Sequence, residues 1–146
     1  MGTRADAAEV VDATRRLAGA LERRLDASLE GLAITYAQLE LLERIAGDRD
    51  AHAAELARKL GCSRQAISSL LARLSLGDLV ELSPLDHGVR VPSITDQGRR
   101  RAHHGSSALR RTFERIEVLP AEERLGFVRA AAALREIVEA SDRRIR

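Results

Sequence analysis

Side chains that can pair with nucleic-acid bases and phosphates share one side of a helix expected to begin at Arg64. This outer side is small or hydrogen-bonding and contains no acid: Arg64, Gln65, Ser68, Ser69, Ala72 and Arg73. Glutamine can bond adenine twice, and arginine can bond guanine or phosphate. The pattern predicts a helix that contacts duplex DNA. The alternative interpretation is that these side chains only solvate the helix.

The other side of the same helix carries leucine and isoleucine at helical spacing. Positions i, i+3, i+4 and i+7 are apolar and should face a core: Ile67, Leu70, Leu71 and Leu74. Ser63 is the expected N-cap. Gly61 supplies a bend after a shorter helix that starts near Ala54, so the segment from Ala54 to Val80 predicts a helix-turn-helix.

The chain has 146 residues, with 45% hydrophobic but only 2% aromatic residues, which favours one mainly helical domain. Its net charge is +2, but residues 58–111 hold ten basic and four acidic residues, a balance of +6. This positive region covers the predicted helix-turn-helix, where a polyanion would bind. One cysteine permits no internal disulfide, and neither a membrane-spanning run nor a signal peptide is evident, so we expect a cytoplasmic location and no membrane partner.

Two helices are expected before this motif. The first runs from about Ala5 to Glu30 and should end at Gly31. Its apolar stripe recurs every four residues and needs a covering partner: Val10 and Thr14, then Leu17, Leu21, Leu25 and Leu29. The second begins with a capping box of Thr35 and Gln38 and ends near Gly47, with Ile34 and Leu39 as a hydrophobic staple.

A β-hairpin and two more helices are expected after it. Short apolar pieces surround a turn at residues 84–88, and Pro92 limits its strand to an edge or a bulge. Thr95 should cap a helix over about 96–118, which two glycines weaken, Gly98 and Gly105. Pro120 suits the first residue of a last helix that reaches about Ala140.

The order helix, helix, helix-turn-helix, hairpin, helix, helix resembles the MarR (multiple antibiotic resistance regulator) family of winged-helix transcription factors. The segments that carry the resemblance are TYAQLELLERIA, ELARKLGCSRQAISSLLARL and DHGVRVPSITDQG. The resemblance implies a mainly α fold with a small β-hairpin wing. It further implies a winged helix-turn-helix domain at 32–100 and a helical dimerisation region made of 1–31 plus 110–146.

The wing departs from the family pattern. Family wings commonly carry Asp-x-Arg at the tip, whereas Asp86 is followed here by His87 and Gly88. Arg90 is the nearby substitute, and it could either enter a narrow minor groove or pair with Asp86. The full set of predicted DNA-contacting residues is therefore Ser63, Arg64, Gln65, Ser68, Ser69, Arg73, His87 and Arg90.

The remaining reactive residue types favour simple structural roles. Cys62 precedes a helix, where a thiol could sense oxidants, but a buried structural thiol is the preferred interpretation. His103 and His104 lie about 100° apart on a helix, which does not suit a shared metal ion. No paired nucleophile and base and no glycine-rich phosphate loop is evident, so we expect neither an enzyme nor a bound cofactor or metal.

The family often binds small aromatic or phenolic acids in a cleft beside the winged domain. Tyr36, Arg101 and His104 could lie near such a cleft, although core packing is the simpler role for Tyr36. We assign no ligand-binding residue from the sequence.

These observations predict a sequence-specific DNA-binding regulator: a homodimeric repressor that binds a pseudo-palindromic operator and is released by a small-molecule effector. The alternatives are a helical protein–protein adaptor that keeps the winged fold without binding DNA, and a thiol- or metal-responsive regulator.

Overall fold

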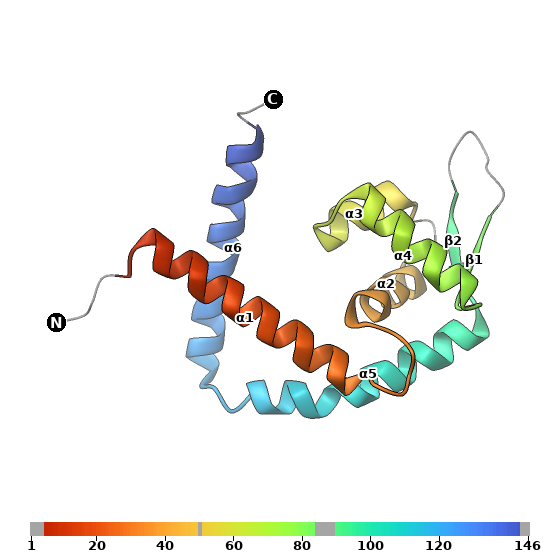
Figure 1. The fold of residues 1–146 in the computed structure, drawn as a ribbon, viewed down its shortest axis with the longest axis horizontal. Coiled ribbons are helices and arrows are strands. Elements are labelled where there is room, and N and C mark those ends of the chain that lie inside the picture. The colour runs from red at the N-terminus through yellow and green to blue at the C-terminus, as the bar shows by residue number, and fades with distance from the viewer. Residues whose placement is uncertain (1–4, 50, 84–89, 144–146) are drawn as a thin grey trace. The chain divides into compact units, whose positions relative to one another are not determined.

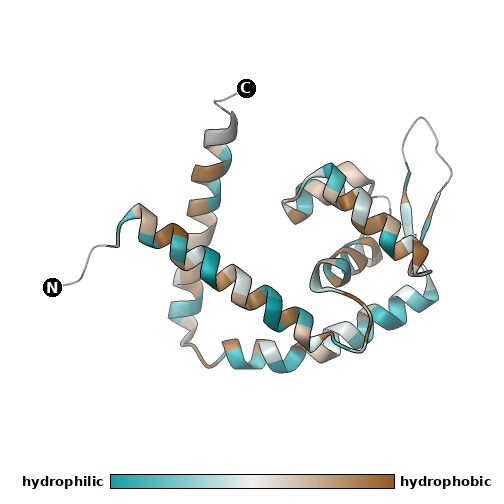
Figure 2. Ribbon diagram, in the orientation of Figure 1, coloured by the Kyte–Doolittle hydropathy of each residue, from teal (hydrophilic) through white to brown (hydrophobic). Residues whose placement is uncertain are grey.

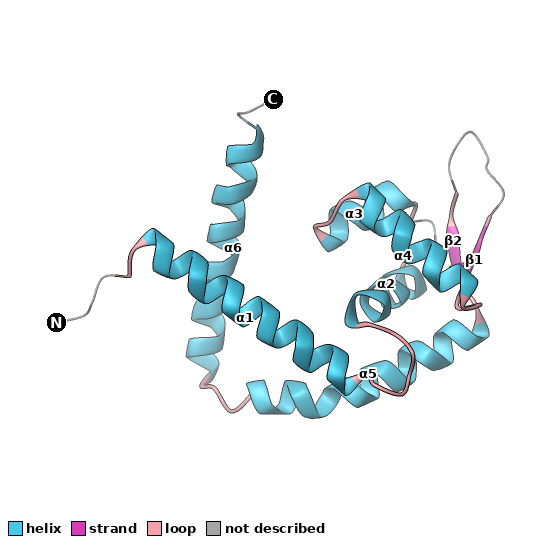
Figure 3. Cartoon of the chain, in the orientation of Figure 1, coloured by secondary structure: helices cyan, strands magenta, loops and turns pink. Residues whose placement is uncertain are grey.

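The computed structural model describes residues 5–49, 51–83 and 90–143, with side chains described up to residue 140 (Figure 1). These residues form six helices and one two-stranded antiparallel sheet (Figure 3), which confirms the predicted mainly α class with a small hairpin. The elements are α1 Ala7–Ser28, α2 Tyr36–Gly47, α3 Ala53–Leu60, α4 Arg64–Leu76, β1 Val80–Leu82, β2 Pro92–Ile94, α5 Asp96–Ile116 and α6 Ala121–Arg143.

The chain divides into two compact units, residues 1–110 and residues 111–146. The boundary falls inside α5, so the first unit holds everything from α1 to most of α5 and the second holds α6. None of the helices in the described residues is long and apolar enough to cross a bilayer.

The first helix begins and ends close to its predicted bounds. Asp6 and Glu9 form a capping box at the start of α1, each side chain accepting the other residue's backbone N–H at 2.9 Å. The helix ends at Ser28, before the predicted stop at Gly31, which adopts a left-handed φ of 89° in the following turn. Only the second half of the apolar stripe is covered within the structure, because Leu25 and Leu29 are buried while Leu17 is 40% exposed.

The second helix confirms the predicted capping box. Thr35 Oγ1 accepts the Gln38 N–H at 3.3 Å, and Gln38 Oε1 accepts the Thr35 N–H at 2.9 Å. Ile34 and Leu39 are both buried, as the proposed staple requires. An unexpected contact also ties α1 to α2, since the Asp26 carboxylate accepts the Tyr36 N–H at 2.6 Å.

Four buried residues place α2 at the centre of the first unit: Leu39, Leu41, Leu42 and Ile45, each at most 2% exposed. Side chains of α1, α3, α4, the sheet and α5 join them in one hydrophobic core. The predicted helix-turn-helix therefore packs against α2, a helix that is buried on several sides. This close packing limits the movement of the motif.

The hairpin has a defined base. Val80 pairs with Ile94 and Leu82 with Pro92, so the proline lies on a strand of a two-stranded sheet that has only edges, as predicted. Thr95 caps α5 as predicted, because its Oγ1 accepts the Gly98 N–H at 2.9 Å and donates to the Asp78 carbonyl at 2.7 Å. The predicted tip at 84–88 lies outside the described residues.

The two glycines of α5 have a role that the sequence did not indicate. A Cβ atom at Gly98 would lie 2.1 Å from the Leu79 carbonyl oxygen, and one at Gly105 would lie 2.9 Å from Leu39 Cδ1. The glycines let α5 approach the start of the hairpin and α2 closely. Glycine lowers the helix propensity of α5 at both positions, and the missing Cβ atom allows closer packing there.

The second unit is helical and exposes much of its apolar surface. Pro120 lies just before α6 rather than as its first residue, and its carbonyl accepts the Arg124 N–H at 3.0 Å. Glu122 and Glu123 occupy the first turn, as expected. Five large apolar residues of α6 are at least half exposed: Leu125, Phe127, Val128, Ile137 and Val138.

Candidate nucleic-acid interface

A short turn holds α3 and α4 as the predicted helix-turn-helix. Gly61 takes the left-handed conformation (φ 65°) that ends α3, and the Cys62 N–H bonds the Ala57 carbonyl at 3.0 Å. Ser63 Oγ accepts the Ala66 N–H at 3.1 Å, which confirms it as the N-cap of α4. The direction of α4 is therefore set by local residues and not by a long loop.

The two sides of α4 differ as the sequence predicted. Ile67, Leu71 and Leu74 are buried in the core, and Leu70 is partly buried against it. The outer side is exposed and contains the contact residues predicted on this helix and its N-cap, together with Ala72: Ser63, Arg64, Gln65, Ser68, Ser69, Ala72 and Arg73. This outer side, which we call the α4 outer face, spans about 14 Å from Arg64 to Arg73, and an α-helix of this size fits the major groove.

The arginines of the α4 outer face have no acidic partner within the part of the chain that the structure describes. Neither Arg64 nor Arg73 forms an ion pair with any residue that the structure describes. Their guanidinium groups can therefore bond phosphate or guanine without first breaking an internal contact.

The structure describes only one of the two predicted contact residues of the wing. Arg90 is exposed beside the hairpin base, whereas His87 and Asp86 lie outside the described residues. Contact of His87 and Arg90 with DNA stays a prediction, as does the alternative pairing of Arg90 with Asp86.

Cys62 is exposed, so the expectation of a buried thiol was wrong. It lies in the two-residue turn between the end of α3 and the N-cap of α4, whereas Leu56 of α3 and Ile67 of α4 are buried. Turns usually lie on the protein surface, and the backbone hydrogen bond that closes this one does not require the Cys62 side chain to be buried.

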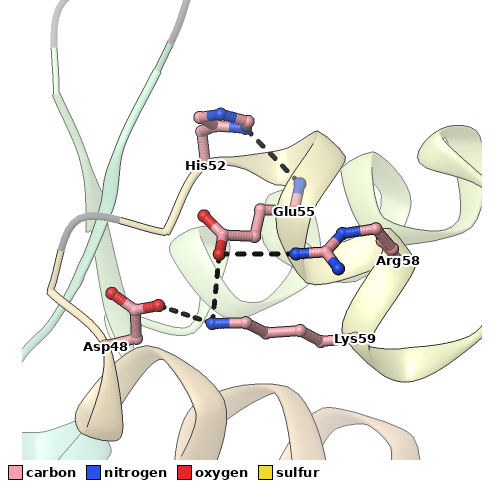
Figure 4. A network of polar contacts seen from close by, with 5 residues as sticks. All are labelled: Asp48, His52, Glu55, Arg58 and Lys59. Atoms are coloured by element: carbon pink, nitrogen blue, oxygen red, sulfur yellow. Dashed lines mark hydrogen bonds and ion pairs between the residues drawn. The ribbon is translucent and has the colours of Figure 1, made fainter.

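A polar network links the last turn of α3 to the end of α2 (Figure 4). Lys59 Nζ lies 2.6 Å from Asp48 Oδ2 and 3.2 Å from Glu55 Oε1, while Arg58 is 3.8 Å from the same Glu55 oxygen. His52 caps α3, its Nδ1 accepting the Glu55 N–H at 3.4 Å. The i, i+4 spacing of Glu55 and Lys59 was the available sequence signal. The ion pair between Lys59 and Asp48 can be recognised only from the folded structure.

The network gives a prediction for alkaline pH. Hydrogen bonds from Lys59 to Asp48 and then to Glu55 raise the pKa of Lys59. The folded state therefore holds this proton more tightly than the unfolded chain. The resulting stability is complete below the unfolded pKa of about 10.4 and is lost as pH rises through the higher folded pKa. We expect the free energy of unfolding of wild type to fall towards that of Lys59→Met above about pH 10.

Urea unfolding of both proteins across this pH range measures the effect. Burial, followed by Glu40 and Glu43, also raises the pKa of Tyr36, which acts in the same range. Both proteins should therefore be compared in a Tyr36→Phe background. A constant difference between them at every pH would contradict a role for the Lys59 proton.

None of the residues considered for a ligand cleft lines the cavity found among the described residues. Tyr36 is partly buried against the core, in line with core packing, and Arg101 donates a hydrogen bond to the Leu32 carbonyl. His104 is exposed, with its ring centroid 6.0 Å from that of His103. That cavity has a volume of about 190 Å³ and is lined by residues of α2, the turn after it, β2 and α5: Ile45, Ala46, Arg49, Ser93, Ile94 and Arg99. Within the described residues, no group of three or more His, Cys, Asp or Glu side chains could hold a metal ion.

Comparison with known proteins agrees with this geometry. Residues 34–88 match the model of the MarR family. No curated protein sequence matches the chain.

Solved structures share the fold at low sequence identity. A MarR family transcriptional regulator from Streptomyces coelicolor is 21% identical, with a TM-score of 0.77 over 91% of this chain and 94% of its own. The M. tuberculosis transcriptional regulator MOSR, solved in complex with DNA, is 23% identical, with a TM-score of 0.77 over 89% and 96%. The S. coelicolor regulator PcaV, solved with its natural ligand, is 20% identical, with a TM-score of 0.78 over 97% and 99%.

The two comparisons support each other. The family model covers α2 to the hairpin, where the helix-turn-helix lies, and the structural matches extend over α1, α5 and α6 as well. Residues 34–88 therefore match the MarR family model, within a chain that has the winged-helix fold of solved MarR family transcriptional regulators.

Proposed function

We propose that this protein is a sequence-specific DNA-binding transcriptional regulator that acts as a homodimeric repressor in the cytoplasm. The observation that carries the proposal is the α4 outer face, which is exposed, free of acid and held by a buried row on its other side. Glutamine, serine and arginine on such a helix suit base edges and phosphates in a major groove. MOSR, which has the same fold, was solved in complex with DNA.

The exposed apolar residues of α6 support the homodimer. Phe127, Val128 and Ile137 are 57%, 62% and 65% exposed, more apolar surface than a helix in water usually presents. A second copy of the chain would cover them. A two-fold pair of α4 helices would then contact half-sites roughly 34–36 Å apart on a pseudo-palindrome. An effector that changes their separation would release the DNA.

Gel-shift titration of the DNA upstream of the protein's own gene, at two salt concentrations, tests the proposal. We expect binding that survives an excess of random DNA at the higher salt, and sedimentation as a dimer. A chain that sediments as a monomer, or that binds no duplex better than random DNA, would contradict the proposal. The second of these results would favour the helical adaptor, against which the acid-free α4 outer face argues.

A second candidate function is a thiol-responsive version of the same regulator, favoured by the exposure of Cys62 beside the N-cap of α4. Modification at this turn would place a new group next to the α4 outer face. A thiol-alkylating reagent should then release bound DNA from wild type and not from Cys62→Ser. Release from both proteins, or from neither, would remove this candidate.

The wing gives a prediction about salt dependence. If Arg90 contacts a phosphate or a minor groove, Arg90→Ala should reduce the slope of log affinity against log salt by about one unit. Fluorescence anisotropy at several salt concentrations measures this slope. An unchanged slope would place Arg90 outside the DNA interface and favour its pairing with Asp86.

A further inference from the structure

A second basic surface lies along the first part of α5. Four residues at i, i+3, i+7 and i+10 share its solvent side and are all exposed: Arg100, His103, Ser107 and Arg110. We call them the α5 basic row. This stretch of α5 is mostly hydrophilic in Figure 2. Helical spacing puts the four side chains one above another over about 15 Å.

The charges of this row are not neutralised within the described residues. Arg100 and Arg110 form no ion pair there, whereas the neighbouring Arg99 lies 3.9 Å from Asp96. No acid occurs between Asp96 and Glu114. Some arginines of other helices are paired, as Arg16 with Asp12 in α1 and Arg135 with Glu139 in α6. Mixed charges stabilise helices in water, and residues 97–113 of α5 contain no acid that could supply them.

The α5 basic row and the α4 outer face lie on opposite sides of α2. The inner side of α5 faces α2, since a Cβ at Gly105 would touch Leu39. The buried row of α4 packs into the same core around α2, and Figure 1 shows α2 between the two helices. A straight duplex held by the α4 outer face therefore cannot also contact the α5 basic row.

The chemistry of the row fits phosphates better than a protein surface. Protein interfaces need buried apolar or aromatic anchors, and the row has none. Arginine and serine donate hydrogen bonds to phosphate oxygens, and 15 Å corresponds to roughly four base-pair steps of a duplex. We propose that the α5 basic row is a second, sequence-independent contact surface for duplex DNA, separate from the α4 outer face.

This inference does not depend on the proposed function, and one set of full-length variants tests the two separately. The α5 variant carries Arg100→Ala and Arg110→Ala, and the α4 variant carries Arg64→Ala and Gln65→Ala. A third protein combines all four changes. The matched control replaces two exposed arginines of α1, Arg15→Ala and Arg24→Ala. Fluorescence anisotropy measures the binding of a labelled random-sequence duplex at several salt concentrations, and circular dichroism checks that each variant folds.

We expect the α5 variant to bind the random duplex roughly tenfold more weakly, with a salt slope reduced by about two units. The α4 variant should keep a residual affinity that only the combined variant loses, and the α1 control should bind like wild type. Equal binding by the α5 variant and wild type would overturn the inference, as would complete loss of binding in the α4 variant alone. If the α5 variant bound the random duplex more weakly and the α4 variant bound it like wild type, the result would uphold the inference and contradict the proposed role of α4.

Discussion

Replacing Gly98 by alanine is expected to destabilise the first unit by about 3 kcal/mol or more. The new Cβ atom would lie 2.1 Å from the Leu79 carbonyl oxygen and 2.8 Å from Ile94 Cγ1. A backbone oxygen cannot rotate away as a side chain can, so α5 would have to move from the base of the hairpin. That movement would also strain the hydrogen bond from the Gly98 N–H to Thr95 Oγ1. Urea unfolding followed by circular dichroism measures the loss.

Two other glycines serve as controls for this prediction. A Cβ atom at Gly126 in α6 meets nothing within 4 Å, so Gly126→Ala should stabilise its helix by roughly 0.5–1 kcal/mol. Gly105→Ala meets the flexible end of Leu39 at 2.9 Å and should cost less than Gly98→Ala. If Gly98→Ala and Gly126→Ala changed stability equally, the close approach of α5 to Leu79 would be disproved.

Replacing Gln65 by alanine is expected to weaken binding to the preferred operator by about 1–3 kcal/mol and to relax one base position. Gln65 lies in the first turn of α4, exposed on the acid-free face, and its amide can bond adenine at two atoms. Because random DNA does not present that base in register, binding to random duplex should change little. Competition gel shifts with operator and random duplexes give both affinities.

The matched control for Gln65 is Gln97→Ala. Gln97 is exposed in the first turn of α5, away from the α4 outer face. The Gln97→Ala change removes the same type of side chain outside the predicted interface, so operator affinity should stay at the wild-type value. Equal losses on operator and random DNA for Gln65→Ala would show that Gln65 contributes to binding but does not recognise a base.

Local sequence signals were sufficient to place most helix ends. The Thr35–Gln38 capping box, the Ser63 N-cap and the left-handed Gly61 all appear where their residue types predicted them. Each signal depends on atoms within a few residues of one another, so neighbouring residues alone decide it. The ends of α1 and α5 were less exact, because fraying helix ends depend on what packs beside them.

Contacts between elements distant in sequence were not predictable in the same way. The exposure of Cys62 depends on which side of the turn the core lies, and the bond from Asp26 to the Tyr36 N–H depends on how α1 meets α2. The ion pair of Lys59 with Asp48 joins α3 to the residue that caps the end of α2. Sequence spacing carries no information about such distances.

The sequence by itself determined the elements of this protein and the two-sided character of α4, because helical periodicity sorts Ile67 and Leu71 to one side and Gln65 and Ser69 to the other. Only the tertiary structure decided that Gly98 must be a glycine, and that the α5 basic row faces away from α4. The physical reason is that periodicity fixes directions around one helix axis, whereas close packing and opposite faces exist only after several axes have been placed around α2.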